Sequence, residues 1–339
     1  MAKRAEASRS AKASGEDRLI ARHFKPIARN PGALGLTDDA AMLTPPPGHA
    51  LVVTADAIVG GVHFFPDDPP DAIAKKALRV NLSDLAAKGA KPAGFVLTLA
   101  LSRGVGDDWL KGFARGLGAD AKAYDCPLFG GDTVYTPGPV TISITAFGSV
   151  PKSTMVKRSG ARAGDHVIVT GTIGDAALGL KLRKKRGAAK RWKLDTAMQR
   201  HLLARYLVPQ PRNALAEALR LHASAAMDVS DGLVGDLGKL CRASGVGAEV
   251  DVARVPLSKA ALAALVADPK TTETMLTGGD DFEVVATVPP RKLKSFLAAA
   301  RRAGVPATGI GRITARTGAR FLGPDNRPLR FARASFSHF

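Results

Sequence analysis

The chain has 339 residues, of which 45% are hydrophobic and 23% charged, with 49 Lys and Arg against 30 Asp and Glu. This length predicts two domains with substantial cores, and the hydrophobic share excludes a wholly disordered chain. The apolar stretch at residues 93–101 is too short to cross a bilayer, and the first residues lack the apolar segment of a secretory signal. Cys126 and Cys241 form neither a metal-type spacing nor a disulfide framework. We therefore expect a cytoplasmic protein without a membrane partner.

The net charge of +19 raises the question of nucleic-acid binding. The basic residues are spread along the chain, with one dense run at residues 181–193. Aromatic residues make up only 5% of the chain, so it lacks the stacking platforms of single-strand binders. We expect the run to be a solvated helix end and expect no nucleic-acid partner. A basic nucleic-acid-binding protein is the alternative from a different functional class.

The first half of the chain predicts helices alternating with strands. Residues 1–14 are polar, small and charged, which is typical of a disordered tail, and a helix follows with Ser14 as its N-cap. Hydrophobic periodicity then predicts strands at 50–56, 93–101 and 140–150, and helices at 71–88 and 107–124. The polar, glycine-bearing stretch at 151–164 indicates a domain boundary. We expect an N-terminal domain at 15–150 and a C-terminal domain at 151–339.

The second half repeats this mixed α/β rhythm. A strand at 166–170 leads through a glycine-rich turn at 171–174 into a helix. Further helices are predicted at 195–207, 212–222, 231–244 and 289–303, and strands at 225–228 and 282–288. The turn lacks the G-x-G-x-x-G spacing of dinucleotide sites, and the chain carries no P-loop, protein-kinase signature or nucleophile elbow.

Five short segments place Asp beside Gly, Ser or Thr and next to apolar runs. They are residues 35–39, 54–56, 81–84, 130–132 and 228–232, and residues 278–281 have the same character. A carboxylate at the edge of a core needs a partner, because desolvating an unpaired charge is costly. Several such groups would repel one another if they converged, unless cations lay between them. Magnesium bound to phosphates suits this pattern, because it prefers carboxylate oxygens and keeps substrate oxygens as its other ligands.

Each of these acids also has a structural interpretation. Asp84 falls on the apolar face of its predicted helix, so it is either a metal ligand or a buried partner of Arg79. Asp132 follows an apolar strand at 126–129, and Gly-Gly-Asp is a common turn. Ser230 or Asp231 could be the N-cap of the next helix, whose free amides would equally suit a phosphate.

In order and spacing, these segments resemble those of thiamine-monophosphate kinases. The superfamily also holds aminoimidazole ribonucleotide synthetase, selenophosphate synthetase and a hydrogenase-maturation protein. The resemblance runs from about residue 15 to residue 339 and is most specific at 81–87 and 228–233. It implies an α/β (α+β) class and a two-domain aminoimidazole ribonucleotide synthetase-like fold. The N-terminal domain would pair across a homodimer to build a β-barrel-like interface.

The resemblance also implies roles for individual residues. Ligands of several Mg²⁺ ions would be Asp39, Thr54, Asp56, Asp84, Asp132, Asp228 and Asp231. ATP would be held by Gly131, Asp132, Arg158 and Ser230, and thiamine phosphate would contact His63, Asp280 and Phe336. The chain departs from the family pattern at Ala55, where a Thr is common, and at Asp280 and Phe282, where Glu and Tyr are common.

The implied activity is ATP-dependent phosphorylation of thiamine monophosphate to thiamine diphosphate, the final step of thiamine diphosphate biosynthesis. Direct in-line transfer needs positioning and charge neutralisation more than proton transfer. The nucleophile is a phosphate oxygen that is already anionic near neutral pH, so we expect no catalytic general base. The alternative within the superfamily is another ATP-dependent member, such as aminoimidazole ribonucleotide synthetase.

Overall fold

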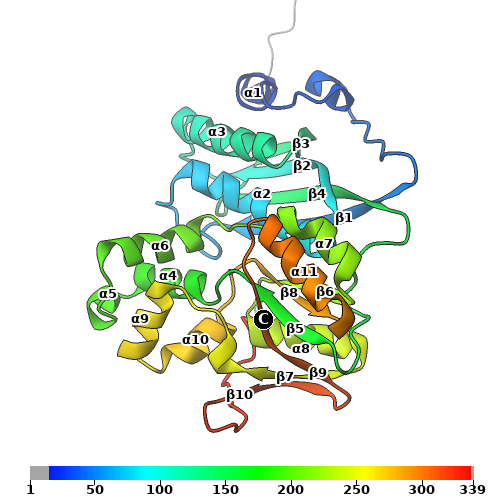
Figure 1. Cartoon of the computed structure of the whole chain (residues 1–339). Helices are drawn as coiled ribbons and strands as arrows, with labels where there is room; N and C mark the ends of the chain where they lie inside the picture. Colours follow the sequence, from blue (N-terminus) through cyan, green and yellow to red (C-terminus); the bar gives the residue numbers. More distant parts are fainter. Residues whose placement is uncertain (1–14, 337–339) are drawn as a thin grey trace, which may run out of the picture.

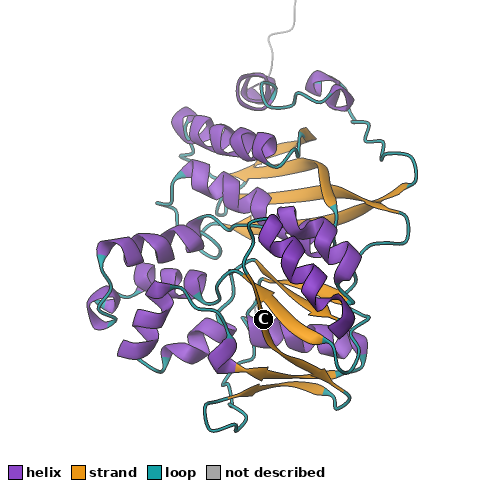
Figure 2. Ribbon diagram, viewed as in Figure 1, coloured by secondary structure: helices purple, strands orange, loops and turns teal. Residues whose placement is uncertain are grey.

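The computed structural model describes residues 15–336, so the tail expected at 1–14 lies outside the described residues. The described chain forms two α/β units, each with its own sheet and hydrophobic core (Figure 1). Figure 2 shows the two sheets one above the other, with helices beside both. No helix in the described part of the chain is long and apolar enough to cross a membrane.

The N-terminal unit is built on a four-stranded sheet in the order β1-β4-β2-β3. Strands β1, β4 and β2 pair antiparallel, whereas β2 and β3 pair parallel. Helix α2 packs against the sheet and α3 packs beside α2. The bounds are β1 (His49–Val59), α2 (Pro70–Ala87), β2 (Lys91–Leu101), α3 (Asp107–Ala123), β3 (Leu128–Tyr135) and β4 (Thr141–Pro151).

A helical segment precedes this sheet. It begins with α1 (Gly15–Leu19), continues through a π-helical turn at Ile20–Phe24 and ends in a 3₁₀ segment, η2 (Pro31–Leu36). Phe24 is buried in the core of the N-terminal unit. The η2 segment lies beside β3, and this contact places the following acidic residues at the open edge of the sheet.

The C-terminal unit has a six-stranded sheet in the order β10-β7-β9-β5-β8-β6. Its strands are β5 (His166–Thr170), β6 (Ala225–Val229), β7 (Gly247–Asp251), β8 (Glu283–Val288), β9 (Ala307–Thr314) and β10 (Gly318–Leu322). Its helices are α4 (Asp175–Lys184), α5 (Ala188–Arg191), α6 (Thr196–Leu207), α7 (Ala216–His222), α8 (Leu233–Ser244), α9 (Lys259–Ala267), α10 (Thr271–Thr277) and α11 (Pro290–Arg302). Short 3₁₀ turns are η3 (Asn213–Leu215) and η4 (Val252–Arg254).

Helix α2 lies between the two units. It contacts β1 and β4 on one side and β6, β8 and η3 on the other. Most of its residues are accordingly buried, including Leu78, Leu82 and Leu85, which have no exposed surface. The buried residues also include the polar Lys76, Asn81 and Ser83. The position of α2 therefore brings several of its polar side chains to the junction of the units.

The periodic segments are confirmed to within a few residues, and so is the glycine-rich turn at 171–174 that leads into α4. The strand expected at 166–170 is β5, and the helix expected at 71–88 is α2. The alternative of a turn at 130–132 is wrong, because these residues continue strand β3 and pair with β2. Strands β7, β9 and β10 and helices α9 and α10 were not predicted.

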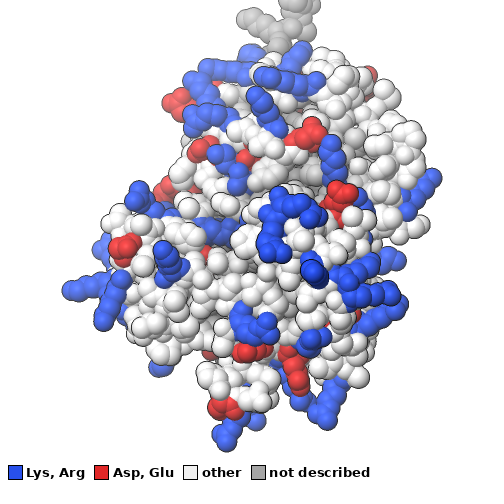
Figure 3. Space-filling model, in the orientation of Figure 1, with Lys and Arg blue, Asp and Glu red and all other residues white. Residues whose placement is uncertain are grey.

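The basic run at 181–193 is more than a solvated helix end. Its lysines and arginines from Lys184 to Arg186 are exposed, but Trp192 is buried and packs in a small core with Leu178 and Leu202. Figure 3 shows Lys and Arg scattered over both halves of this face, with acidic groups between them.

Arg79 pairs with a different acid from the expected one. Its Nε lies 2.6 Å from Oδ2 of Asp120, and its Nη2 donates to Oδ1 of the same carboxylate. Its Nη1 donates to the carbonyl of Pro209 in the C-terminal unit, at 2.9 Å. The alternative in which Asp84 is the buried partner of Arg79 is therefore wrong. Arg79 joins α3 to the second unit instead.

We expect Arg79→Ala to lower the free energy of unfolding by about 3–5 kcal/mol, because it leaves the buried Asp120 carboxylate without its partner. Arg115→Ala is the matched control, since Arg115 is exposed on the same helix as Asp120. Urea unfolding followed by circular dichroism measures both. A loss equal to that of the control would contradict the structural role of the pair.

Candidate active site

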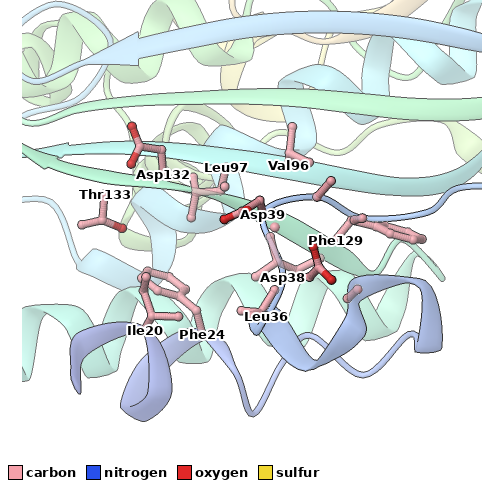
Figure 4. Close-up of a pocket in the computed structure, with 16 residues that line it drawn as sticks. Ile20, Phe24, Leu36, Asp38, Asp39, Val96, Leu97, Phe129, Asp132 and Thr133 are labelled. Carbon is pink, nitrogen blue, oxygen red and sulfur yellow. The ribbon is translucent and has the colours of Figure 1, made fainter. Parts of the chain in front are cut away.

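Two cavities contain nearly all of the residues that the sequence singled out. The first lies between the units, has a volume of about 250 Å³ and is lined by Asp56, His63, Asp84, Arg158, Asp228, Ser230, Asp231, Asp280 and Phe336, among others. The second lies at the edge of the N-terminal sheet, has a volume of about 280 Å³ and is lined by residues that include Asp38, Asp39, Gly131 and Asp132 (Figure 4). The expected metal ligands are thus divided between the two cavities.

The carboxylates of the first cavity come from both units. Asp56 lies near the end of β1, Asp84 on the enclosed helix α2, and Asp228 on β6. Thr54 faces the same side of β1 as Asp56, since side chains two apart share a face of a strand. Its hydroxyl donates to Oδ2 of Asp84 at 2.5 Å. Non-local packing therefore brings together acids that are far apart in the sequence.

Burial and neighbouring carboxylates raise the pKa values of Asp56 and Asp228. Asp56 is exposed as a residue, yet desolvation of its carboxyl group, followed by the charges of Asp84 and Asp231, raises its pKa to about 6. Burial raises the pKa of Asp228 well above its usual value, and Asp84 adds to the effect. Burial is thus the main cause of both pKa shifts, and the neighbouring carboxylates add to it.

Two lysines offset part of the negative charge of these acids. Lys88 Nζ donates to the carbonyl of Ala226, and burial lowers its pKa, followed in effect by the nearby Arg158. Lys239 Nζ forms an ion pair with Asp231 and lies 2.8 Å from Oδ1 of Asp236. The sequence reasoning missed Lys239 and Asp236, although their i, i+3 spacing on a helix was a usable signal.

The acids are close enough to repel one another, but they do not form a ready-made metal cage. Among residues 15–336, no three His, Cys, Asp or Glu side chains gather around one possible ion position. Magnesium, however, is usually held by one or two carboxylates together with substrate phosphates and water. Separate carboxylates with raised pKa values fit ions that arrive with phosphate groups.

The loop before α8 is capped differently from the expectation. The N-cap is Gly232, which has no side chain to accept a hydrogen bond. Instead, Oδ2 of Asp236 accepts from the backbone N–H groups of Asp231 and Gly232, at 2.9 and 3.1 Å. The N-cap roles considered for Ser230 and Asp231 are therefore wrong. Both residues line the cavity instead.

The first cavity is also lined by aromatic and apolar residues. His63 follows β1, and its Nδ1 accepts from the backbone N–H of Val59 at 3.0 Å. Phe336 is half-exposed, and its backbone N–H donates to the carbonyl of Asp231 at 3.0 Å. Tyr206 on α6 also lines the cavity and was missed, because a single Tyr on a predicted helix carries no local signal.

The second cavity combines apolar walls with acids at its mouth. In Figure 4, Ile20, Phe24 and Leu36 lie on one side, and Leu97 and Asp132 on the strands opposite. Asp38 and Asp39, on the segment after η2, are also labelled there, as expected from their place beside β3. Such a pocket suits a flat apolar group carried by a charged molecule.

Gly131 explains why β3 can lie so close to β2. It pairs with Leu97 in the parallel register. A Cβ at this position would lie 1.8 Å from the carbonyl oxygen of Leu97, which is a steric clash. At Gly130 a Cβ would meet no atom within 4 Å. Only the second glycine of the pair is therefore required by packing.

Comparison with known proteins assigns the chain to a family. The family model for the N-terminal domain of AIR synthase related proteins matches residues 37–150, and the model for the C-terminal domain matches residues 162–322. The chain is 43% identical to the thiamine-monophosphate kinase of Caulobacter vibrioides over 317 residues, covering 92% of this chain and 88% of that protein. The chain belongs to the thiamine-monophosphate kinase family.

Solved structures agree with this family assignment. The structure of thiamine-monophosphate kinase from Stenotrophomonas maltophilia superimposes with a TM-score of 0.80 at 39% identity, covering 92% of this chain and 96% of that one. A structure of AaThiL complexed with AMPPCP and TMP superimposes with a TM-score of 0.75 at 30% identity, covering 89% and 91%. The expected aminoimidazole ribonucleotide synthetase-like fold is confirmed.

We expect Gly131→Ala to push β3 away from β2, because the new methyl group would overlap a main-chain carbonyl. The melting temperature should fall by several degrees, and hydrogen exchange in residues 128–135 should accelerate. Gly130→Ala, the matched control, should keep the wild-type melting temperature. Equal behaviour of the two variants would refute the assignment of the close contact to Gly131.

Proposed function

We propose that the protein transfers the γ-phosphoryl group of ATP to thiamine monophosphate, giving thiamine diphosphate and ADP. The observation that carries the proposal is the cavity between the units, whose lining contains residues from four of the six acidic segments together with Arg158, His63 and Phe336. Relatives named thiamine-monophosphate kinase align with nearly the whole chain. AaThiL, with the same fold, was solved with a nucleotide analogue and TMP.

The acids of both cavities would hold the magnesium ions of the reaction, and the Thr54 hydroxyl beside Asp84 would assist them. The acids are Asp39, Asp56, Asp84, Asp132, Asp228 and Asp231. Bound Mg²⁺ supplies charge neutralisation, so that two anionic phosphate groups can approach each other. The raised pKa values of Asp56 and Asp228 support this assignment, because arriving cations would stabilise the charged forms that burial and the neighbouring carboxylates disfavour.

The protein side chains would orient the two substrates. Gly131 and Asp132 would hold ATP at the edge of β3, and the apolar walls of the second cavity would accept its base. Arg158 and Ser230 would contact its phosphates across the first cavity, where Arg158 adds a charge-assisted hydrogen bond. The phosphate oxygen of thiamine monophosphate would then attack in line, without a phosphoenzyme and without a general base.

The vitamin would occupy the aromatic end of the first cavity. His63 and Asp280 would contact it, and Phe336 would face the thiazolium cation, a cation–π contact of about 0.5–2 kcal/mol. Asp280 supplies the carboxylate that a cationic ring requires. We place the reaction in the cytoplasm, at the last step of thiamine diphosphate biosynthesis. The two domains of the protein would be residues 15–150 and 151–339.

Incubation of the pure protein with ATP, Mg²⁺ and thiamine monophosphate should yield thiamine diphosphate, measured by chromatography of the thiochrome derivatives. Asp132→Asn should lower kcat at least 100-fold at saturating Mg²⁺, since it removes an anionic oxygen that Mg²⁺ requires. Asp108→Asn is the control, because the side chain of Asp108 is 98% exposed on α3. Absence of product from the wild-type protein would sink the proposed function.

We further propose that the protein is a homodimer through the outer face of the N-terminal sheet. Along β1, Leu51, Val53, Ala55 and Ala57 are all exposed and share the face turned away from Asp56. Leu51 and Val53 are 38% and 58% exposed. An apolar row on a sheet face is typical of a surface covered by a partner. A second copy of this face would cover it and continue the curvature of the sheet.

Val53→Asp should convert the dimer into monomers, because it would bury a carboxylate at the centre of the proposed interface. Size-exclusion chromatography with light scattering gives the mass directly. Val266→Asp is the control, because Val266 is 77% exposed at the end of α9, in the other unit. A wild-type protein that elutes as a monomer would overturn the interface.

A further inference from the structure

A buried lysine contacts Asp280, which lines the first cavity. Lys76 lies on α2 and only 4% of its side chain is exposed. Its Nζ lies 2.9 Å from Oδ2 of Asp280 and 2.9 Å from the carbonyl oxygen of His63. The same Nζ lies 4.2 Å from the centre of the Tyr206 ring. The ammonium group therefore has an anionic, a carbonyl and an aromatic partner.

These partners belong to segments that meet only in the folded protein. His63 follows β1, Asp280 precedes β8, and Tyr206 is on α6. Asp280 and Lys76 are 204 residues apart in the sequence. Burying a lone ammonium group costs several kcal/mol, so the contact is stable only when the carboxylate and the carbonyl are both in place. One side chain thus couples the two halves of the substrate site.

The backbone around Asp280 is held just as firmly. Asp280 has φ of 63° and Phe282 has φ of 50°, a region that side-chain-bearing residues rarely adopt. Hydrogen bonds from Asp280 N to Ser230 O and from Phe282 N to Val229 O hold this conformation, at 2.8 and 2.9 Å. Strained residues of this kind concentrate at ligand sites. The main-chain hydrogen bonds fix the position of the Asp280 backbone, and the contact with Lys76 orients its carboxylate.

The loop that carries His63 is anchored to the second unit as well. Phe65 packs edge-on against Tyr206, with ring centroids 6.0 Å apart. Arg183 lies over the Phe65 ring at 4.6 Å and pairs with Asp67 at 2.8 Å. These contacts involve the start of the basic run and bring the loop close to α4 and α6. Lys76 lies among these contacts through Tyr206, whereas Arg183 contacts the loop at Phe65 and Asp67.

We propose that Lys76 is a positioning residue of the substrate site, one that binds Asp280 and the His63 carbonyl and so holds the vitamin-recognition groups in one arrangement. This inference rests on the proposed function. Lys76 is not among the described residues that line the cavity, so it acts through Asp280 rather than on the substrate. By engaging Oδ2, it presents Oδ1 to the cationic ring.

Lys76→Met, which keeps the length and removes the charge, should raise the KM for thiamine monophosphate about tenfold or more, the effect of losing one charge-assisted hydrogen bond. The KM for ATP should stay within about twofold, because its expected contacts lie elsewhere. Lys75→Met is the matched control. Lys75 is the neighbouring residue on α2 but is half-buried rather than buried, and this variant should keep both KM values.

A double-mutant cycle separates positioning from general stability. If Lys76 acts through Asp280, Lys76→Met combined with Asp280→Asn should be no worse than the more damaged single variant. Additive losses, or equal increases in both KM values, would overturn the proposal. If Lys76→Met does not fold, Lys76→Gln replaces it, with the same expectation for the two KM values.

Direct binding distinguishes this proposal from the proposed function. Calorimetric titration of the protein with thiamine monophosphate alone needs no turnover. Weaker binding to Lys76→Met than to the wild type supports the positioning role even if the wild type forms no thiamine diphosphate. The opposite outcome is a wild type that forms thiamine diphosphate and a Lys76→Met variant that binds thiamine monophosphate with the same affinity as the wild type. That outcome would support the proposed function and refute the role of Lys76.

Discussion

The structure depends on placing carboxylates at the junction of two folded units, where they are desolvated and repel one another. Asp84 on the enclosed helix α2 and Asp228 on β6 face the same cavity as Asp56. The pKa values of Asp56 and Asp228 are raised as a result. Such buried charges do not stabilise a fold, because replacing them with apolar groups of similar size is often neutral or stabilising. The arrangement is favourable once cationic partners and phosphate groups share the cavity, which is why we assign it to phosphoryl transfer.

Long polar side chains, rather than apolar contacts alone, hold the two units in place. Arg79, Lys88, Asn213 and Arg220 each donate to a main-chain carbonyl of the other unit, at 2.9 to 3.1 Å. Directional bonds of this kind fix the position of α2 more narrowly than apolar packing, which tolerates sliding. The Lys76–Asp280 contact follows the same principle at the substrate end. The same type of interaction therefore sets both the domain geometry and the orientation of the recognition groups.

Local patterns predicted the elements where burial has a simple period. The alternating strand at 140–150 and the helix at 107–124 correspond to β4 and α3 within one or two residues. The local pattern did not distinguish a turn from a strand at Gly130 and Gly131, because glycines occur both in turns and where two strands pair closely. The pairing with β2 decides that these residues form a strand. It failed again at Arg79, because Asp84 is nearer in sequence whereas Asp120 is nearer in the fold. The caps expected before α8 were wrong for a similar reason, since Asp236 reaches back to those amides.

By itself, the sequence determined the mixed α/β class, the order of the acidic segments and their resemblance to one kinase family, because these properties depend on residue type and spacing. Only the tertiary structure decided that the acids divide between two cavities, that Thr54 bonds Asp84, and that Lys76 binds Asp280. The physical reason is that helix and strand periodicity are local, whereas the charge balance at the junction depends on side chains that meet only after both units have packed around α2.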